Sequence, residues 1–257
     1  MTDWAAQIKD IATMALALPG RVLFPPVCAG CGRQVGEPGS LCGRCWPKLR
    51  FLDRPWCPVM GTPFAQDMGE NFLSAEAIAN PPPFARARAA VIYSGVARQM
   101  VQRLKYNDRT DLAPWMARWM VRAGFELLPD ADLIVPVPLH RGRFFRRRFN
   151  QSAELARAIG RATGTAFEPE AVVRIKVTRQ QVGLGHKERE ENVRAAFAVP
   201  VGSRERIRGR RILLVDDVYT TGATVAAVTR VLRKGGACAV DVLTFARVLP
   251  GDFLPEE

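Results

Sequence analysis

The sequence predicts an α/β protein, in which a small cysteine-rich module precedes a parallel sheet with helices on both of its faces. Three observations support this fold class. Residues 212–215 (ILLV) form an unbroken apolar run, typical of a buried parallel strand, and a helix-forming segment follows soon after. From residue 89 onward, strand-like and helix-like segments alternate. Two Cys-x-x-Cys pairs lie close together between residues 28 and 45.

Length and composition set the broad class. The 257 residues allow one large domain or a core domain with an appendage, and a hydrophobic content of 48% is enough for a packed core. A net charge of +12 and a pI of about 10.1 favour a polyanionic partner, which would be nucleic acid, an anionic membrane surface or a phosphorylated substrate. A basic solvated face that keeps the protein in solution is the alternative.

The first residues indicate neither a membrane span nor a signal peptide. No apolar run is long enough to cross a bilayer, and the start of the chain lacks a basic segment. We therefore expect a cytoplasmic protein. Residues 1–22 have the pattern of an amphipathic helix that ends at Pro19 and Gly20, because one helical face carries Trp4, Ile8, Ile11, Ala15 and Leu18.

Residues 23–60 are predicted to form a zinc-ribbon module. Each Cys-x-x-Cys pair makes a tight turn that directs two thiolates at one point, and two such turns complete a tetrahedral site for Zn²⁺. The ligands are expected to be Cys28, Cys31, Cys42 and Cys45. Redox-active dithiols are the alternative, but these usually occur as one pair at the start of a helix. Because four thiolates close the coordination shell, the metal should be structural.

The two other cysteines fit no metal pattern. Cys57 would begin a further Cys-x-x-Cys pair, but Met60 stands in the fourth place, so Cys57 is interpreted as a remnant or a buried apolar side chain. Cys238 lies in an apolar stretch and is expected in the core. Residues 61–88 contain Gly and Pro throughout and are interpreted as an irregular connector.

Residues 89–250 carry the α/β pattern, and residues 251–257 form a short tail. Strands are expected at residues 87–94, 132–140, 171–176, 212–215 and 239–248, and helices at residues 95–109, 111–128 and 151–164 and after residue 224. The first of these helices should end at Lys105 and Tyr106. Residues 178–197 are polar and contain glycine before a helical end, which is typical of a mobile lid.

Two arginine-rich stretches account for much of the positive charge. Residues 141–148 and 204–211 each hold five Arg, and the first is interleaved with Phe144, Phe145 and Phe149. Aromatic rings among arginines can stack on the bases of single-stranded DNA, or they can anchor a basic loop to the core. If the two stretches share a face, they would form a basic strip beside the ligand site described next.

A phosphate-and-sugar site is predicted where the strand at residues 212–215 meets its helix. The start of a helix presents unpaired N–H groups to a phosphate. The Thr/Gly loop at residues 220–224 adds hydroxyl donors, and its glycine lets the backbone approach the phosphate closely. The preceding carboxylates, Asp216 and Asp217, suit the two hydroxyls of a neighbouring diol. Phosphate beside a diol describes a ribose 5-phosphate. Any strand-to-helix turn of an α/β protein can carry Asp, Thr and Gly, which is the alternative interpretation.

The stretch from Ile212 to Val225 resembles the phosphoribosyl-diphosphate (PRPP) binding motif of type I phosphoribosyltransferases. Nearly the whole chain is similar to the ComF family of competence-associated proteins. The motifs that carry this similarity are the two Cys-x-x-Cys pairs followed by LKY (104–106), VPVPL (135–139), RRRFNQS (146–152), TRQQVGL (178–184) and VDDVYTTGAT (215–224). The resemblance implies a type I phosphoribosyltransferase fold, a Rossmann-like parallel sheet, together with a zinc-binding module and a link to DNA uptake. Met60 departs from the family pattern and puts a second zinc site in doubt.

The resemblance also implies roles for individual residues. Asp216 and Asp217 would hold the ribose hydroxyls with Mg²⁺ nearby, and Lys105 would help to neutralise the pyrophosphate. The 5-phosphate would lie against Thr220, Thr221, Gly222, Ala223 and Thr224. The pyrophosphate would face Val135, Pro136, Val137 and Pro138. The closing loop would contain Arg179, Gln180, Gln181, Val182, Gly183 and Leu184.

Three functions are compatible with these features. The first is a phosphoribosyltransferase that displaces pyrophosphate from ribose in favour of an unknown acceptor. The second is a module that senses PRPP or a nucleotide while its arginines hold single-stranded DNA. The third is an adaptor whose zinc module docks a competence helicase or another DNA-uptake protein. The acid pair and Lys105 favour a working PRPP site over a pure scaffold.

Overall fold

The computed structural model describes residues 25–69, 71–106, 109–139, 149–175 and 195–249. The chain divides into two compact units, Met1–Lys48 and Leu49–Glu257. The helix expected over residues 1–22 lies outside the described residues. Within the described part, no helix is both long and apolar enough to cross a membrane.

The described part of the first unit is built from turns. A β-bridge joins Val27 to Gln34, and the chain between them turns sharply at Gly32, whose φ of 78° is in the left-handed region. The unit ends in the short 3₁₀ helix η1 (Trp46–Lys48). Such turns bring cysteines that are three residues apart to the same side of the chain.

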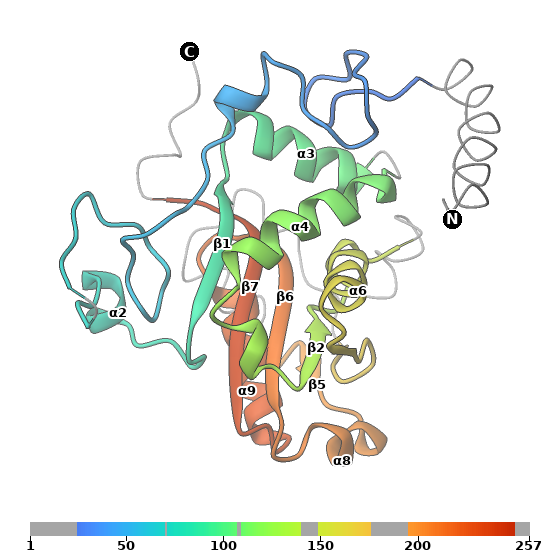
Figure 1. Cartoon of the computed structure of the whole chain (residues 1–257). Helices are drawn as coiled ribbons and strands as arrows, with labels where there is room; N and C mark the ends of the chain where they lie inside the picture. The colour runs from blue at the N-terminus through green and yellow to red at the C-terminus, as the bar shows by residue number, and fades with distance from the viewer. Residues whose placement is uncertain (1–24, 70, 107–108, 140–148, 176–194, 250–257) are drawn as a thin grey trace, which may run out of the picture. The chain divides into compact units, whose positions relative to one another are not determined.

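The second unit contains a parallel sheet with helices packed against it (Figure 1). Its first half consists of α2 (Ala75–Ala79), β1 (Ala87–Ile92), α3 (Gly95–Tyr106), η2 (Thr110–Leu112), α4 (Ala113–Ala123), η3 (Leu128–Asp130) and β2 (Leu133–Pro136). Its second half consists of α6 (Gln151–Thr163), β3 (Ala166–Phe167), β4 (Val173–Arg174), β5 (Phe197–Ala198), η4 (Val201–Ser203), α8 (Arg204–Ile207), β6 (Arg211–Tyr219), α9 (Ala223–Lys234) and β7 (Ala239–Arg247).

The sheet is buried on both faces. Its order is β1-β7-β6-β2-β3, every pair is parallel, and all residues from Ile212 to Val215 in β6 are fully buried. Helices α4 and α6 pack on one face and α9 packs on the other (Figure 1). An apolar run without alternation is what a strand covered on both faces requires, so the prediction from residues 212–215 is confirmed.

The sheet has a topological switch point between β2 and β6. After β2 the chain passes through α6 to β3, away from β6, and after β6 it passes through α9 to β7, away from β2. The two connections leave in opposite directions on opposite faces of the sheet. Ligands of open α/β sheets bind in the crevice outside the carboxyl ends of two such strands.

The strand expected at residues 171–176 is present but shorter, as β4 (Val173–Arg174). It pairs antiparallel with Phe197–Ala198 in a separate ribbon, and β3 occupies the edge of the main sheet. A short apolar run indicates strand conformation but not its partner, which the rest of the fold decides. Cys238 is exposed rather than buried, because it lies in the turn before β7 begins. Cys57 is fully buried, as predicted.

Candidate functional site

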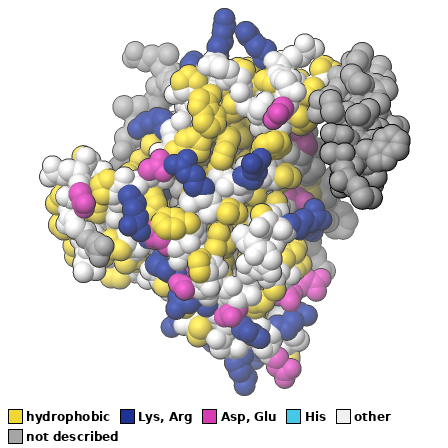
Figure 2. Space-filling view, viewed as in Figure 1, with side chains coloured by type: hydrophobic (Ala, Val, Ile, Leu, Met, Phe, Trp, Pro, Cys, Tyr) yellow, Lys and Arg dark blue, Asp and Glu magenta, His cyan; other side chains and the backbone are white. Residues whose placement is uncertain are grey.

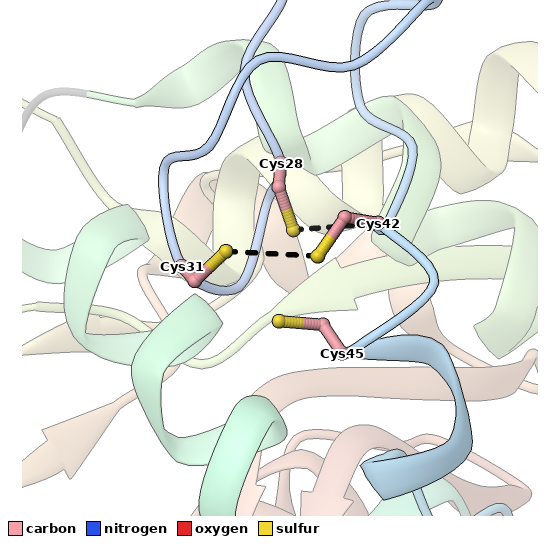
Figure 3. A group of neighbouring side chains, drawn as sticks. All are labelled: Cys28, Cys31, Cys42 and Cys45. Carbon is pink, nitrogen blue, oxygen red and sulfur yellow. Dashed lines mark hydrogen bonds between the residues drawn. The ribbon is translucent and has the colours of Figure 1, made fainter.

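The four cysteines of the first unit converge on one point (Figure 3). The sulfur atoms of Cys28, Cys31, Cys42 and Cys45 all lie within 4.8 Å of one another. Sulfurs around a tetrahedral zinc ion are about 3.8 Å apart when each Zn–S bond is about 2.3 Å. Cys31 Sγ and Cys42 Sγ are separated by 3.7 Å. The donor set and its spacing therefore fit a structural zinc ion, as the sequence predicted.

Backbone N–H groups favour the thiolate form of part of this cluster. Burial raises the pKa of Cys28, but N–H groups of Cys42, Cys31 and Gly30 outweigh it and lower this pKa to about 6. The N–H of Cys42 lies 3.2 Å from Cys28 Sγ. In contrast, burial and the neighbouring sulfurs raise the pKa of Cys45 to about 12. A bound zinc ion supplies the positive charge that ionises such a thiol.

The acid pair lies within β6 in the second unit. The apolar run ends at Val215, but β6 continues to Tyr219, with Asp216 paired to Thr244 of β7. The main chain of the acid pair is therefore fixed by the sheet and not by a loop. On the other side, the N–H of Val137 donates to the carbonyl of Val215 at 2.9 Å, so the chain leaving β2 runs directly beside the acid pair.

The two carboxylates have different surroundings. Asp216 Oδ1 accepts from the hydroxyl of Ser152 at 2.8 Å and from the N–H of Asp217 at 2.9 Å. Burial, followed by the negative charge of Asp217, raises the pKa of Asp216 to about 7, although these hydrogen bonds and Lys105 act against the shift. Asp216 is therefore partly protonated near neutral pH when no ligand is bound.

Lys105 is delivered to the acid pair by the last turn of α3. Its Nζ lies 2.9 Å from Asp217 Oδ2. Burial by itself lowers the pKa of Lys105, but the charges of Asp217 and Asp216 raise it above its usual value, so the ammonium stays charged. The structure thus brings Lys105 of α3 to the acid pair of β6, an association that the sequence suggested only through the family resemblance.

The Thr/Gly loop joins β6 to α9. Gly222 is the N-cap of α9, with φ of 74°, and the hydroxyl oxygen of Thr221 accepts a hydrogen bond from the N–H of Ala223 at 3.5 Å. Ala223 is the first helical residue, and a side chain at Gly222 would meet the hydroxyl of Tyr219 at 2.3 Å. The arrangement combines a helix start, the hydroxyls of Thr220, Thr221 and Thr224, and a glycine that the backbone requires. Its chemistry suits a phosphate.

A main-chain hydrogen bond holds the segment that follows β2 beside β6. Val135 and Pro136 end β2, Val137 and Pro138 follow, and all four are buried. The N–H and the carbonyl of Val137 both have hydrogen-bond partners within the fold, namely Val215 and Asn150. The closing-loop residues 179–184 and the basic residues 141–148 lie outside the described residues.

Two residues at the start of α6 complete the site and were not selected from the sequence. Asn150 caps α6 by accepting from the N–H of Ser152 at 3.1 Å, and its side-chain N–H donates to the carbonyl of Val137 at 3.0 Å. Ser152 reaches Asp216 in turn. The signal was present in FNQS, because Asn followed by a helical pattern indicates an N-cap. Its link to Asp216 depends on which strands are neighbours.

The second arginine-rich stretch does not lie beside this site, contrary to the shared basic strip considered above. Arg211 opens β6, five residues before Asp216, which is about 16 Å along a strand. Helix α8, which precedes β6 in the chain, lies at the lower end of the sheet in Figure 1. Several of these arginines are also ion-paired: Arg206 with Glu168, Arg210 with Asp132 and Arg211 with Asp241. The start and the end of a strand lie at opposite ends of the sheet. Residues 204–211 are therefore far from Asp216 although they are close to it in the sequence.

Two family models match the chain. A model described as double zinc ribbon domain covers residues 20–77, and one described as phosphoribosyl transferase domain covers residues 156–253. Among solved structures, one titled structure of the allosteric regulatory enzyme of purine biosynthesis shares 24% sequence identity over 56% of this chain and 29% of that chain, with a TM-score of 0.38.

Curated relatives cover most of the chain. The DNA utilization protein YhgH of Escherichia coli (strain K12) is 30% identical over 218 residues, which is 82% of this chain and 91% of that protein. Competence protein F of Haemophilus influenzae is 30% identical over 230 residues, which is 86% of this chain and 90% of that protein. With a four-cysteine zinc-ribbon module and a phosphoribosyltransferase-type parallel α/β sheet, the chain belongs to the ComF family.

Proposed function

We propose that the protein binds PRPP together with Mg²⁺ at the carboxyl ends of β2 and β6 and transfers its phosphoribosyl group to an acceptor. The observation that carries the proposal is the position of the acid pair. Asp216 and Asp217 lie at the switch point of the sheet, Lys105 contacts Asp217, and α9 starts at Ala223, six residues after Asp217. Carboxylates for a diol and a helix start for a phosphate are thus adjacent, as a ribose 5-phosphate requires.

The charges of the site support a divalent cation. Asp216 and Asp217 contribute two carboxylates, and Lys105 Nζ, at 2.9 Å from Asp217, is the cation paired with them among the described residues. The pKa of Asp216 is raised first by burial and then by the negative charge of Asp217, and a bound cation would favour the ionised form. Carboxylate oxygens are ligands that Mg²⁺ prefers, and Mg²⁺ also binds substrate phosphates. When bound, Mg²⁺ would supply countercharge for the pyrophosphate leaving group.

The chain's own residues would orient and hold the substrate. Asp216 and Asp217 would accept hydrogen bonds from the ribose hydroxyls and offset positive charge that develops on the sugar. The loop at residues 220–224 would donate to the 5-phosphate from its hydroxyls and from the N-terminal N–H groups of α9. In the reaction, the bond from the anomeric carbon to a pyrophosphate oxygen breaks and a bond to the acceptor nucleophile forms. Lys105 would stabilise charge on the leaving group.

The relatives suggest the cellular setting. The names of two of them refer to DNA utilization and to competence. We therefore place the proposed reaction in the uptake or use of external DNA, with the acceptor left open. A net charge of +12 suits a protein that works near a polyanion.

Titration calorimetry with PRPP tests the binding site. We expect binding that requires Mg²⁺ and that falls at least tenfold in the double variant Asp216→Asn/Asp217→Asn, which keeps shape and removes charge. The matched control is Asp53→Asn/Asp111→Asn, which changes the net charge equally at two exposed aspartates of the same unit. Equal loss in both double variants, or no loss in either, would contradict the assignment.

Release of pyrophosphate tests turnover. The protein is incubated with PRPP, Mg²⁺ and a panel of nucleobases and amines, and pyrophosphate is measured over time. Acceptor-dependent release that the Asp216→Asn/Asp217→Asn variant lacks would support a transferase. PRPP binding with no release for any acceptor would favour a sensor.

A further inference from the structure

A turn in the second unit repeats the first cysteine turn hydrogen bond by hydrogen bond. The first turn has Cys28 N–H to Arg33 C=O at 2.6 Å and Gly32 N–H to Cys28 C=O at 3.0 Å, and the second has Cys57 N–H to Thr62 C=O and Gly61 N–H to Cys57 C=O, both at 2.8 Å. A β-bridge closes each turn, Val27 with Gln34 and Trp56 with Pro63. The glycines have φ of 78° and 66°. Every partner is displaced by the same 29 residues, from Cys28 to Cys57.

The second Cys-x-x-Cys turn of the first ribbon, at Cys42 and Cys45, also has a counterpart in the second unit. In the first ribbon the N–H of Cys42 lies 3.2 Å from Cys28 Sγ, and in the second the N–H of Ser74 lies 3.4 Å from Cys57 Sγ. A helical turn starts at each position: Trp46 N–H donates to the Cys42 carbonyl at 3.0 Å, and Ile78 N–H donates to the Ser74 carbonyl at 3.1 Å. Ser74 therefore corresponds to Cys42, and Ala77 corresponds to Cys45.

The four ligand positions of this second ribbon are thus Cys57, Met60, Ser74 and Ala77. The double zinc ribbon model ends at residue 77, the last of them. One thiol, a thioether, a hydroxyl and a methyl group cannot form the closed thiolate or imidazole shell of a structural zinc site. The residues present therefore do not fit the second metal that the family description implies.

Packing and hydrogen bonds occupy the place of the metal. Cys57, Met60 and Ala77 are 0%, 3% and 5% exposed and belong to the same apolar cluster as Tyr219 of β6. Cys57 Sγ accepts from the N–H of Met60 as well as that of Ser74, both at 3.4 Å, and the Ser74 hydroxyl caps α2 by accepting from Ala77 N–H at 3.3 Å. Each polar group at the former ligand positions has a partner within the fold.

The second ribbon is also fixed to the sheet. Ala87 N–H of β1 donates to the carbonyl of Val59 at 2.7 Å, and Arg247 of β7 donates to the carbonyl of Met60 at 2.6 Å. The guanidinium of Arg247 lies 4.2 Å from the centre of the Tyr219 ring, next to the Thr/Gly loop. A ribbon held in this way needs no ion to order its turns.

We infer that the protein contains a second zinc-ribbon fold that holds no metal, with Cys57, Met60, Ser74 and Ala77 as its four former ligand positions. The protein then binds one zinc ion, at Cys28, Cys31, Cys42 and Cys45. The inference concerns metal content and is independent of the proposed reaction with PRPP.

Metal analysis of the purified chain and its variants tests this inference. We expect one zinc per chain in the unmodified protein and in Cys57→Ser, and none in Cys28→Ser/Cys31→Ser. The triple variant Met60→Cys/Ser74→Cys/Ala77→Cys restores four thiols and should hold two. The matched control Met60→Ser/Ala77→Ser makes similar changes of size without adding a thiol and should hold one. Cobalt replacement gives a second measurement, because thiolate-to-cobalt absorption should double in the triple variant alone.

Three results would overturn the inference. The first is two zinc ions in the unmodified protein. The second is zinc that remains in Cys28→Ser/Cys31→Ser and is lost when Cys57→Ser is added. The third is a folded triple variant, judged by circular dichroism and its thermal midpoint, that still binds one metal ion, since the four positions would then not converge as ribbon ligands do.

Discussion

At the scale of single residues, we expect Asp216 to make the proposed PRPP binding depend on pH. Its pKa is about 7, so below neutral pH a proton must leave before the carboxylate can hold a cation. If one proton is displaced, the affinity for PRPP with Mg²⁺ should fall by up to about tenfold per pH unit below pH 7 and level off above it. Calorimetry at pH 6, 7 and 8 measures this. Ser152→Ala removes a hydrogen bond that lowers the pKa, so its midpoint should move to higher pH. A flat profile would contradict the assignment.

A rise in pH should strengthen PRPP binding through Asp216, but it should lower the stability of the ligand-free protein through the same residue. The folded-state pKa of Asp216, about 7, exceeds its usual value of 3.8, so protonation of Asp216 stabilises the folded state. This contribution is fully present below pH 3.8 and is lost as the pH rises through 7. Asp216→Asn should therefore stabilise the ligand-free protein more at pH 8 than at pH 4. The difference is on the order of a few kcal/mol, because one pKa unit corresponds to about 1.4 kcal/mol. Thermal unfolding at both pH values provides the measurement.

Gly222 is the second residue with a testable role, because its backbone conformation and its close neighbour Tyr219 both require glycine. In Gly222→Ala the new Cβ would lie 2.3 Å from the Tyr219 hydroxyl at a φ of 74°, so either the loop or the ring must move. We expect a loss of about 1–3 kcal/mol in unfolding free energy and a marked loss of PRPP affinity. Gly209→Ala is the control, because Gly209 has a similar φ of 69° but nothing within 4 Å of its Cβ position. It should be destabilised less and bind PRPP normally; similar affinity losses in both would exclude a local effect on the loop.

At the scale of elements, Asn150 joins β2 to α6 at the site. Its side chain caps α6 through Ser152 N–H and holds the carbonyl of Val137. Asn150→Ala should lose about 1 kcal/mol of stability through the cap alone and should also weaken PRPP binding, because Ser152 would no longer be fixed against Asp216. Denaturant unfolding and calorimetry measure the two effects.

The variant Asn150→Asp separates the two contacts of this residue. Aspartate still accepts from Ser152 N–H at the helix start but cannot donate to Val137, so stability should be largely kept. If the hold on Val137 matters for the ligand, affinity should fall although the cap remains. Unchanged PRPP affinity in both variants would show that the junction does not contribute to binding.

At the scale of the whole molecule, the net charge of +12 predicts weak, sequence-tolerant binding of single-stranded DNA. On the face shown in Figure 2, Lys and Arg side chains are spread over the surface and interspersed with acids. Affinity should therefore come from counterion release and fall steeply with salt. Arg204→Gln/Arg208→Gln should reduce the slope of log affinity against log salt by about 2 if both exposed arginines contact phosphates.

Competition with PRPP locates the DNA site. Residues 204–211 lie at the end of the sheet where β6 begins, and Asp216 lies toward the other end. Saturating PRPP should therefore leave DNA bound at residues 204–211. A labelled oligonucleotide is titrated at low and high salt, with and without PRPP. No binding at low salt would remove the nucleic-acid hypothesis, and displacement by PRPP would show that the DNA occupies a phosphate site instead.

Sequence alone determined those features in which all the chemistry lies within a few consecutive residues. The spacing of Cys28, Cys31, Cys42 and Cys45 predicted the cysteine cluster, and the run at residues 212–215 predicted a strand buried on both faces. Local spacing fixes both because turns and strands place side chains by fixed geometric repeats. Family resemblance was needed to connect Lys105 with the acid pair.

Only the tertiary structure decided which distant segments meet. The sheet order puts β6 between β2 and β7, and this brings Ser152 to Asp216. Ser74 and Ala77 became recognisable as former ligand positions only when their hydrogen bonds could be compared with those of Cys42 and Cys45. The physical reason is that strand neighbours are selected by burial and packing of the entire sheet, which no local spacing encodes.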